Sequence, residues 1–215
     1  MRMARNFAGI GALGGLFILA GCSDPIPPAA QAGISIHLQE YDNMDPVHGM
    51  DKCPPGRHWA NVPADRTRAS GSQQQQTSMD DSRATAVNNQ DGNTVGCAVT
   101  PNGNGFKIVG DATGYATDDS KNPPDKRKPT SIHIRIGKIG DGEDNARGTL
   151  SVQDDASLNP YFSEECTYSV SGGSLGVKAG SIWGRVTCEN LADKSSPGAA
   201  CYVDTGYFLL ENCSQ

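Results

Sequence analysis

The 215-residue chain carries 24 acidic and 18 basic side chains, which gives a formal net charge of −6 at pH 7. An acidic surface disfavours binding to nucleic acid and to anionic lipid headgroups. The chain is 36% hydrophobic and contains 26 glycines and 13 prolines, a mixture typical of short β-strands joined by many turns. No stretch has a convincing helical period, so we expect an all-β chain.

The N-terminus follows the plan of a bacterial secretory signal. Arg2 and Arg5 supply positive charge, and residues 7–20 form an uncharged run of Gly, Ala, Leu, Ile and Phe. A helix needs about 20 residues to cross a hydrocarbon core, and this run is shorter. It suits the apolar region of a signal peptide, which is followed by small residues at a cleavage site.

The run ends in Leu19-Ala20-Gly21-Cys22, which resembles the lipobox of bacterial lipoproteins. In that family a diacylglyceryl group is attached to the cysteine sulfur, and the preceding peptide is removed. The resemblance therefore implies that residues 1–21 are a signal peptide and that Cys22 is the site of lipid attachment. Each buried CH₂ of acyl chains such as palmitate adds about 0.8 kcal/mol of membrane affinity. In Gram-negative lipoproteins, Asp directly after the cysteine favours retention in the inner membrane. This chain has Ser23 at that position, so the resemblance implies the outer membrane. The alternative is an ordinary secretory signal in which Cys22 is incidental.

After Cys22 the chain is expected to form a tether and one domain. Residues 22–32 are rich in proline and cannot bury a core, so they are expected to be an extended tether. Loss of the signal leaves 16 basic and 24 acidic residues, a formal charge of −8, so membrane attachment falls to the lipid. Residues 33–215 are expected to form the domain. Their cysteine-bearing strands and the ending Glu-Asn-Cys-Ser-Gln resemble small, uncharacterised, cysteine-rich lipoproteins of Gram-negative bacteria, a resemblance that carries no functional residues.

Alternating apolar residues predict about eight strands in this domain. Ile34, Ile36 and Leu38 alternate with Ser35, His37 and Gln39, which places His37 on the polar face. Residues 60–93 are polar and predict a long loop. The remaining inward positions are expected at Val95, Cys97, Val99, Phe106, Ile108, Ile132, Ile134, Ile136, Leu150, Val152, Cys166, Tyr168, Val170, Ile182, Gly184, Val186 and Cys188. Such strands predict an antiparallel β-sandwich of two packed sheets, with a jelly-roll or Ig-like course.

Six cysteines remain in an exported chain once Cys22 is set aside, and an even number predicts a disulfide framework. Six thiols allow 15 pairings, which sequence cannot distinguish. We take Cys53–Cys97, Cys166–Cys213 and Cys188–Cys201 as the expected set. The alternative, a metal site, is disfavoured because the chain has no Cys-x-x-Cys.

Two groups of residues have the composition of weak metal sites. His48, Cys53 and His58 could hold zinc, which needs three or four converging ligands. Asp141, Glu143 and Asp144, followed by Asn145, could offer oxygens to calcium. For both groups a solvated loop or hairpin tip is the plainer interpretation, so no metal or cofactor is expected.

One motif in the sequence could indicate an enzyme. Gly172-Gly173-Ser174-Leu175-Gly176 matches the G-x-S-x-G pattern of hydrolases, but no histidine follows Ser174 and no βα alternation exists. A glycine-rich turn is the better interpretation. A hydrolase would instead need Ser174 or His133 in a cleft beside a base, and no catalytic residue is assigned.

Aromatic and basic residues supply the candidate ligand contacts. Trp183 is out of phase with its buried neighbours, so it and Tyr207 form a candidate ligand face, to which Trp59, Tyr161 and Phe162 could add a platform for sugars. Residues 126–128, Lys-Arg-Lys, could contact phosphates or lipopolysaccharide but are better explained as a solvated loop.

The sequence thus predicts a lipid-anchored protein of the cell envelope with a non-catalytic binding or structural role. Its partners would be the membrane, through the lipid, and an envelope polysaccharide or protein. The alternatives are a surface carbohydrate-binding module and a secreted hydrolase.

Overall fold

Regular alternation of apolar and polar residues produces β-strands throughout the part of the chain that the structure describes. The computed structural model describes residues 27–40, 58–63, 85–118, 125–153, 159–193 and 200–215, and none of these is helical. The strands are β1 (Gln31–Glu40), β2 (His58–Val62), β3 (Ala86–Val87), β4 (Thr94–Asn102), β5 (Gly105–Asp118), β6 (Asp125–Ile139), β7 (Ala146–Gln153), β8 (Tyr161–Ser169), β9 (Gly176–Lys178), β10 (Ser181–Asp193) and β11 (Ala200–Glu211).

These strands form one antiparallel sheet with the order β2-β1-β11-β10-β8-β7-β6-β5-β4, while β3 pairs with β1 and β9 pairs with β10. From β4 to β11 the neighbours in the sheet follow the order of the chain, with β9 beside this path. The first strand returns to lie against the last. The expected all-β antiparallel fold is confirmed. The strand order is a meander, whereas jelly-roll and Ig-like courses require Greek-key connections.

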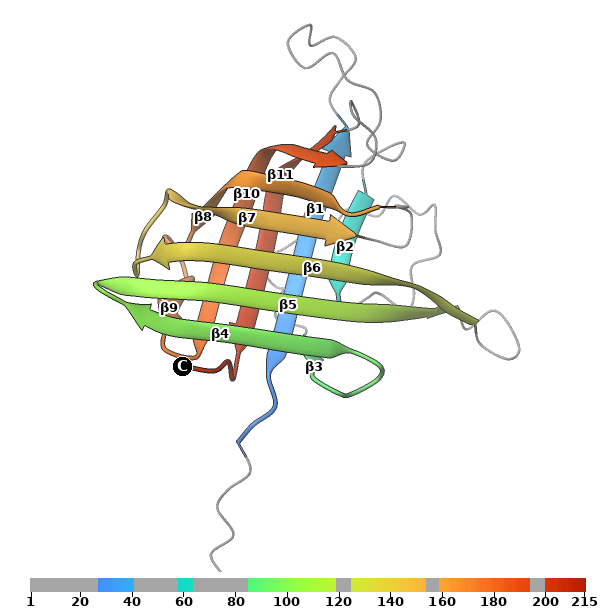
Figure 1. The fold of residues 1–215 in the computed structure, drawn as a ribbon, viewed down its shortest axis with the longest axis horizontal. Helices are drawn as coiled ribbons and strands as arrows, with labels where there is room; N and C mark the ends of the chain where they lie inside the picture. Colours follow the sequence, from blue (N-terminus) through green and yellow to red (C-terminus); the bar gives the residue numbers. More distant parts are fainter. Residues whose placement is uncertain (1–26, 41–57, 64–84, 119–124, 154–158, 194–199) are drawn as a thin grey trace, which may run out of the picture.

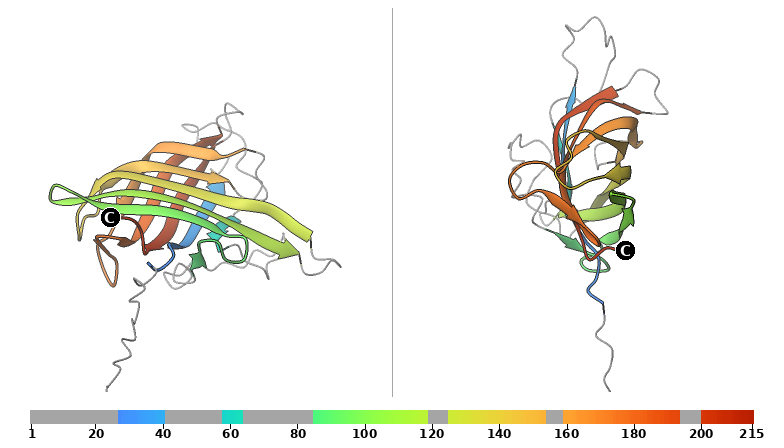
Figure 2. Two further views of the ribbon diagram at one scale, coloured as in Figure 1. Left: turned by 60° about the horizontal axis from the view of Figure 1, so that its bottom comes forward. Right: turned by 90° about the vertical axis from the view of Figure 1, so that its left-hand side faces the viewer.

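The sheet curls on itself and so supplies both layers of the molecule. Figure 1 shows β4 to β7 lying across β10, β11 and β1, which run behind them in a steeply different direction. The side view in Figure 2 shows the two layers on edge. Two packed sheets were expected, and in the structure one continuous sheet supplies both layers. Near-perpendicular crossing is a known way of packing β layers face to face.

The core lies between these layers and contains most of the predicted inward residues, while Cys97 and Phe106 are partly buried against it. Ile132 and Ile134 on β6 are fully buried, as is Ile36 on β1, and each contributes roughly 1.5–3 kcal/mol of burial energy. The layers meet closely at Gly110 of β5, where a Cβ atom would lie 2.7 Å from Cδ1 of Leu210 on β11. Glycine at this position therefore allows front and back layers to touch.

Two disulfides reinforce the sheet, and the pairing differs from the expected set. Cys97 pairs with Cys213, and Cys166 pairs with Cys188, with Cα–Cα distances of 4.8 and 4.4 Å. All three expected pairs are therefore wrong. Cys201 is also disulfide-bonded, and its partner lies outside the described residues.

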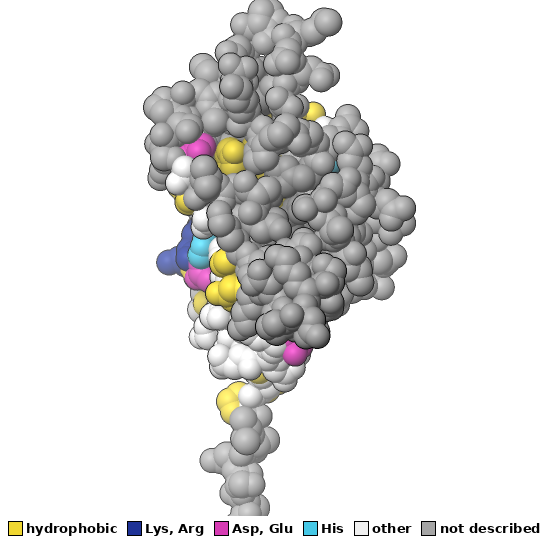
Figure 3. Space-filling view, turned by 90° about the vertical axis from the view of Figure 1, so that its right-hand side faces the viewer, with side chains coloured by type: hydrophobic (Ala, Val, Ile, Leu, Met, Phe, Trp, Pro, Cys, Tyr) yellow, Lys and Arg dark blue, Asp and Glu magenta, His cyan; other side chains and the backbone are white. Residues whose placement is uncertain are grey.

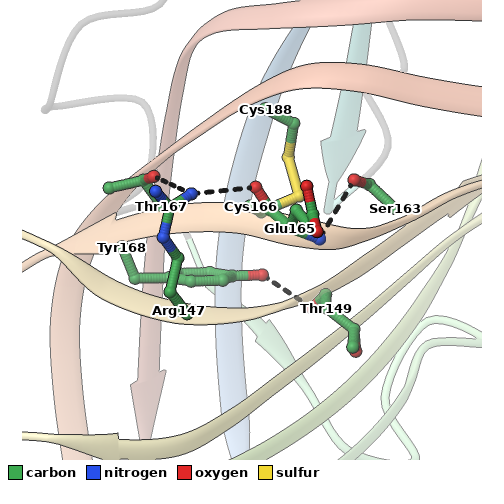
Figure 4. The surroundings of a disulfide bond; sticks show 8 residues. All are labelled: Arg147, Thr149, Ser163, Glu165, Cys166, Thr167, Tyr168 and Cys188. Carbon is green, nitrogen blue, oxygen red and sulfur yellow. Dashed lines mark hydrogen bonds between the residues drawn. A yellow bond between two sulfur atoms is a disulfide. The ribbon is translucent and has the colours of Figure 1, made fainter.

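The Cys166–Cys188 bond lies on the core side and crosses two neighbouring strands. In the antiparallel register of β8 and β10, Thr167 faces Thr187. The next pair of opposed positions is therefore Cys166 and Cys188. Figure 4 shows the bond above the ring of Tyr168, whose hydroxyl donates to the carbonyl of Thr149 at 2.7 Å. The bond thus fixes the register of β8 against β10.

The boundaries of the expected tether and loop also need correction. Strand β1 begins at Gln31, two positions before the expected start of the domain. The expected loop at residues 60–93 is wrong at both ends, because β2 continues to Val62 and β3 occupies Ala86–Val87. Residues 1–26, which include the predicted signal peptide and Cys22, lie outside the described residues. Within the described ranges, no helix has the length and apolar character needed to cross a membrane.

Candidate functional site

The face of β1 that points away from the core carries polar side chains that are nevertheless buried. Ser35, His37 and Gln39 are 2%, 7% and 5% exposed. They alternate with Ile34, Ile36 and Leu38, which face the core. Buried polar groups require hydrogen-bond partners, and the neighbouring strands β2 and β11 supply them here.

The strand register places aromatic residues on both sides of β1. His37 faces Trp59 on β2 and Thr205 on β11, and Ser35 faces Asn61 and Tyr207 on the same two strands. Gln39 faces Tyr202 of β11. We call this set the outer β1 face: Ser35, His37, Gln39, Trp59, Asn61, Tyr202, Asp204, Thr205 and Tyr207.

His37 is the most constrained side chain of the outer β1 face. Its ring stacks on Trp59 with 4.0 Å between centroids and 18° between planes. Its Nδ1 atom lies 2.9 Å from Oδ1 of Asp204, and 3.2 Å from the amide nitrogen of Gln39. The ring is thus held by an aromatic plane on one strand and a carboxylate on another.

These contacts assign the proton on His37. Nδ1 cannot donate to Asp204 and accept from Gln39 at the same time. The carboxylate of Asp204 can only accept, and a charged acceptor makes the stronger hydrogen bond. We therefore place the proton on Nδ1, which in the neutral ring leaves Nε2 as an acceptor. No hydrogen bond to Nε2 exists among the described residues.

Neighbouring polar groups of the outer β1 face are partly engaged. The Ser35 hydroxyl donates to Oδ1 of Asn61 at 2.7 Å, and the Tyr202 hydroxyl donates to Oε1 of Gln39 at 2.8 Å. The first bond uses the acceptor end of the Asn61 amide and leaves its NH₂ group able to donate. The face therefore combines aromatic planes with donor and acceptor groups, as ligand sites commonly do.

The structure places the two predicted ligand-face residues on the same side of the sheet. Tyr207 belongs to the outer β1 face, and Trp183 of β10 lies opposite Leu209 of β11, one row further along. Trp183 is half-buried and contacts neighbouring groups. Of the other predicted platform residues, Tyr161 is part of the core, and Phe162 lies opposite Ser151 on the other layer.

A second polar cluster lies on the outer side of the front layer. Nδ1 of His133 and Nη2 of Arg135 each lie 2.6 Å from Oδ1 of Asp111. Figure 3 shows a histidine side chain at the surface with basic and acidic side chains next to it. Burial alone raises the pKa of Asp111, but the hydrogen bonds and charges of His133 and Arg135 outweigh it and hold the pKa below its usual value.

This cluster meets part of the requirement for a hydrolase. His133 has the carboxylate of Asp111 beside it, and Ser151 faces it from β7. The side chains of His133 and Asp111 are 46% and 40% exposed, so the cluster is open to water. In the described part of the chain no hydrogen bond joins His133 to Ser151, and Arg135 shares the same carboxylate oxygen. The arrangement is an exposed network of charged side chains, with the hydroxyl group of Ser151 on the neighbouring strand β7.

The glycine-rich motif forms a turn. Gly172 and Gly173 have φ values of 87° and 63°, a left-handed conformation that glycine adopts readily. Ser174 is exposed in this turn, and none of the described histidines bonds to it. The turn interpretation of the motif agrees with this geometry.

The three acidic residues of the β6–β7 hairpin make contacts in different directions. Asp141 accepts from the backbone of Val177 at 3.4 Å, Glu143 accepts from the backbone of Gly140, and Asp144 accepts from Ser169 at 2.7 Å. Across the described ranges no three His, Cys, Asp or Glu side chains are grouped as a metal site would require. The predicted zinc residues His48 and Cys53, and the side chains of His58 and of residues 126–128, lie outside what the structure describes.

No family model, no curated protein and no solved structure matches this chain.

Sequence reasoning placed His37 on the polar side of its strand but gave it no role, and it did not single out Asp204. The two are 167 positions apart and meet because β1 pairs with β11. A histidine and a glutamine opposite three aliphatic residues on one strand was the available signal. The carboxylate partner depends on the strand order, which alternation does not reveal.

Proposed function

We propose that this protein is a lipid-anchored protein of the bacterial cell envelope, and that it binds its ligand non-catalytically through the outer β1 face. The observation that carries the binding role is His37, held between Trp59 and Asp204 on the side of β1 that points away from the core. A polar side chain fixed by two neighbouring strands is preorganised, and preorganisation reduces the entropy lost on binding.

The anchoring half of the proposal is supported by residues 1–22, whose charged start, apolar run and final Leu-Ala-Gly-Cys resemble a lipoprotein signal. Replacement of Cys22 by Ser in the full chain tests it. We expect the variant to lose lipid labelling and to leave the membrane fraction. A variant that remains in the membrane fraction, and is processed like the wild type, would contradict the anchor.

Photocrosslinking in the native envelope tests the binding half. A benzophenone amino acid replaces Tyr207 on the outer β1 face, and in a matched control it replaces Lys107, which is exposed on the opposite layer. We expect a discrete adduct from position 207 and none from position 107. Equal adducts at the two positions, or none at either, would remove the outer β1 face from the proposal.

A hydrolase is the second candidate, and it is favoured by one observation: Asp111, His133 and Ser151 lie opposite one another on three consecutive strands. The shared oxygen of Asp111 and the open surface make it the weaker candidate. A fluorophosphonate probe separates the two functions. Labelling that disappears in Ser151→Ala would establish an active nucleophile, whereas equal background in both proteins would leave the binding role in place.

A further inference from the structure

We propose that the ligand of the outer β1 face is a saccharide, and that one of its hydroxyl groups donates a hydrogen bond to Nε2 of His37. The inference rests on the proposed function and names the chemistry of its ligand. It starts from one buried acceptor for which the described protein supplies no donor.

The side chain of His37 is 8% exposed, so its ring nitrogens have little access to bulk water. Nδ1 has the Asp204 carboxylate as partner, while Nε2 has none among the described residues. A buried polar atom without a partner is unfavourable, and such exceptions in folded proteins call for a specific explanation. A ligand that donates to Nε2 would satisfy it.

The groups around Nε2 suit a ligand with one apolar face and a polar rim. Trp59 is half-buried and stacked on the ring of His37, and Tyr207 is half-buried one row away. Asn61 retains donors on its amide, because its oxygen receives the Ser35 hydroxyl. A sugar ring has C–H groups on one side, which pack on aromatic planes, and hydroxyl groups at its edge, which both donate and accept.

Other ligand classes fit these groups less well. A metal bound at Nε2 would need two or three further ligands, and the described residues contain no group of three metal-binding side chains. An anion would meet the carboxylate of Asp204, which is 42% exposed and lies at the same ring. A flat aromatic ligand without an N–H or O–H group could stack but would leave the acceptor on His37 unsatisfied.

Two substitutions at one position separate the acceptor from the rest of the histidine. In His37→Asn the amide nitrogen occupies the place of Nδ1, so the contact with Asp204 is retained and the acceptor at Nε2 is lost. In His37→Gln the longer side chain brings a polar atom near the place of Nε2. The purified full chain and both variants are tested on an array of cell-envelope polysaccharides, and affinities for any saccharide bound are measured by calorimetry.

We expect wild-type binding to a saccharide, a loss of about tenfold or more in His37→Asn, and a smaller loss in His37→Gln. Thermal unfolding of both variants checks that the fold is retained. Nitrogen NMR of the imidazole provides a readout that does not depend on binding or on mutation. It should show the proton on Nδ1 and an unprotonated Nε2.

Several results would contradict the proposal that the ligand is a saccharide. A protonated Nε2 would make His37 a donor and remove the argument. Zinc binding that is abolished in both variants would assign the nitrogen to a metal. Absence of saccharide binding together with a crosslink to a protein from position 207 would refute the saccharide and leave the proposed binding face intact, whereas loss of that crosslink would refute the face itself.

Discussion

The disulfide between Cys97 and Cys213 joins β4, at one edge of the sheet, to the segment that follows β11, 116 positions later in the chain. Hydrogen bonds accompany it on both sides of Ala98. The backbone of Ser214 donates to the carbonyl of Cys97 at 3.0 Å, and Val99 donates to the carbonyl of Ser214 at 2.9 Å. The curled sheet is thus held closed at this edge, and part of the β4 edge is protected from pairing with other chains.

We expect loss of the Cys97–Cys213 bond to destabilise the protein more than loss of the Cys166–Cys188 bond. In the chain-entropy model a closed loop of 116 residues is worth roughly 5 kcal/mol, and one of 22 residues roughly 3 kcal/mol. The two double serine variants are compared by urea denaturation under oxidising conditions. Equal losses would show that native-state strain or residual structure, rather than loop length, sets the contribution of these bonds.

The pairing of Cys201 provides a second prediction. Four of the seven cysteines form the two disulfides described above. The partner of Cys201 is therefore either Cys22 or Cys53. We expect Cys53, because in the proposed lipid anchor the sulfur of Cys22 carries the lipid. Mass spectrometry of a non-reduced digest identifies the linked peptides. A Cys22–Cys201 peptide would contradict both the pairing and the lipid attachment.

The disulfides show where sequence reasoning about this fold stops. Alternation correctly placed Cys166 and Cys188 on the inward side of their strands, because burial has a period of two in any strand. It could not pair them, since pairing depends on which strands become neighbours and in which register. The same limit explains the expectation of two sheets: an inward face is required for a sandwich and for a curled meander alike.

The candidate site was less predictable than the core. Trp183 was assigned to a ligand face because it is out of phase with its buried neighbours, and Tyr207 was assigned to that face as an aromatic residue. The register places the two on the same side of the sheet. His37 and Asp204 meet only through the β1–β11 pairing, which joins the two ends of the domain. Contacts of this separation carry no local pattern that a single sequence could reveal.

Glycine at position 148 is required by the packing of β7. A Cβ atom there would overlap the carbonyl oxygen of Arg135 and lie 2.9 Å from Cε2 of Tyr168. We therefore expect Gly148→Ala to lower the free energy of unfolding by about 2–3 kcal/mol. Gly137→Ala is the matched control, because no atom lies within 4 Å of its Cβ, and its effect should stay within about 0.5 kcal/mol. Similar stabilities of the two variants would show that β7 can shift to make room.

The network around Asp111 predicts a dependence on acid. Burial raises the pKa of Asp111, but its interactions with His133 and Arg135 lower the pKa by more than burial raises it. The folded pKa therefore lies below the unfolded value. The carboxylate then stabilises the fold above about pH 4, and this contribution is lost as the pH falls through the folded pKa. Asp111→Asn should therefore flatten the decline in stability between pH 5 and pH 2.5, measured by urea denaturation. Glu189→Gln, at an exposed position of β10, is the control and should retain the decline. A slope unchanged in Asp111→Asn would mean that the acid response originates elsewhere.

Tyr168 predicts the complementary loss of stability in base. Its side chain is buried in the core, its ring lies edge-on to Phe208 with 5.7 Å between centroids, and its hydroxyl donates to Thr149. Burial raises the pKa of Tyr168 above that of the unfolded chain, with a smaller opposing effect of Arg135. The neutral form is therefore stabilising below about pH 10, and above that pH the unfolded state releases a proton that the folded state keeps. This one group should lower stability by about 1.4 kcal/mol per pH unit above pH 10.

Tyr168→Phe should be less stable at neutral pH by about 1–3 kcal/mol, because the carbonyl of Thr149 loses its donor, yet show a shallower decline in base. Tyr207→Phe on the outer β1 face serves as the control, and a parallel decline in all three proteins would show that the buried hydroxyl of Tyr168 does not set the alkaline limit.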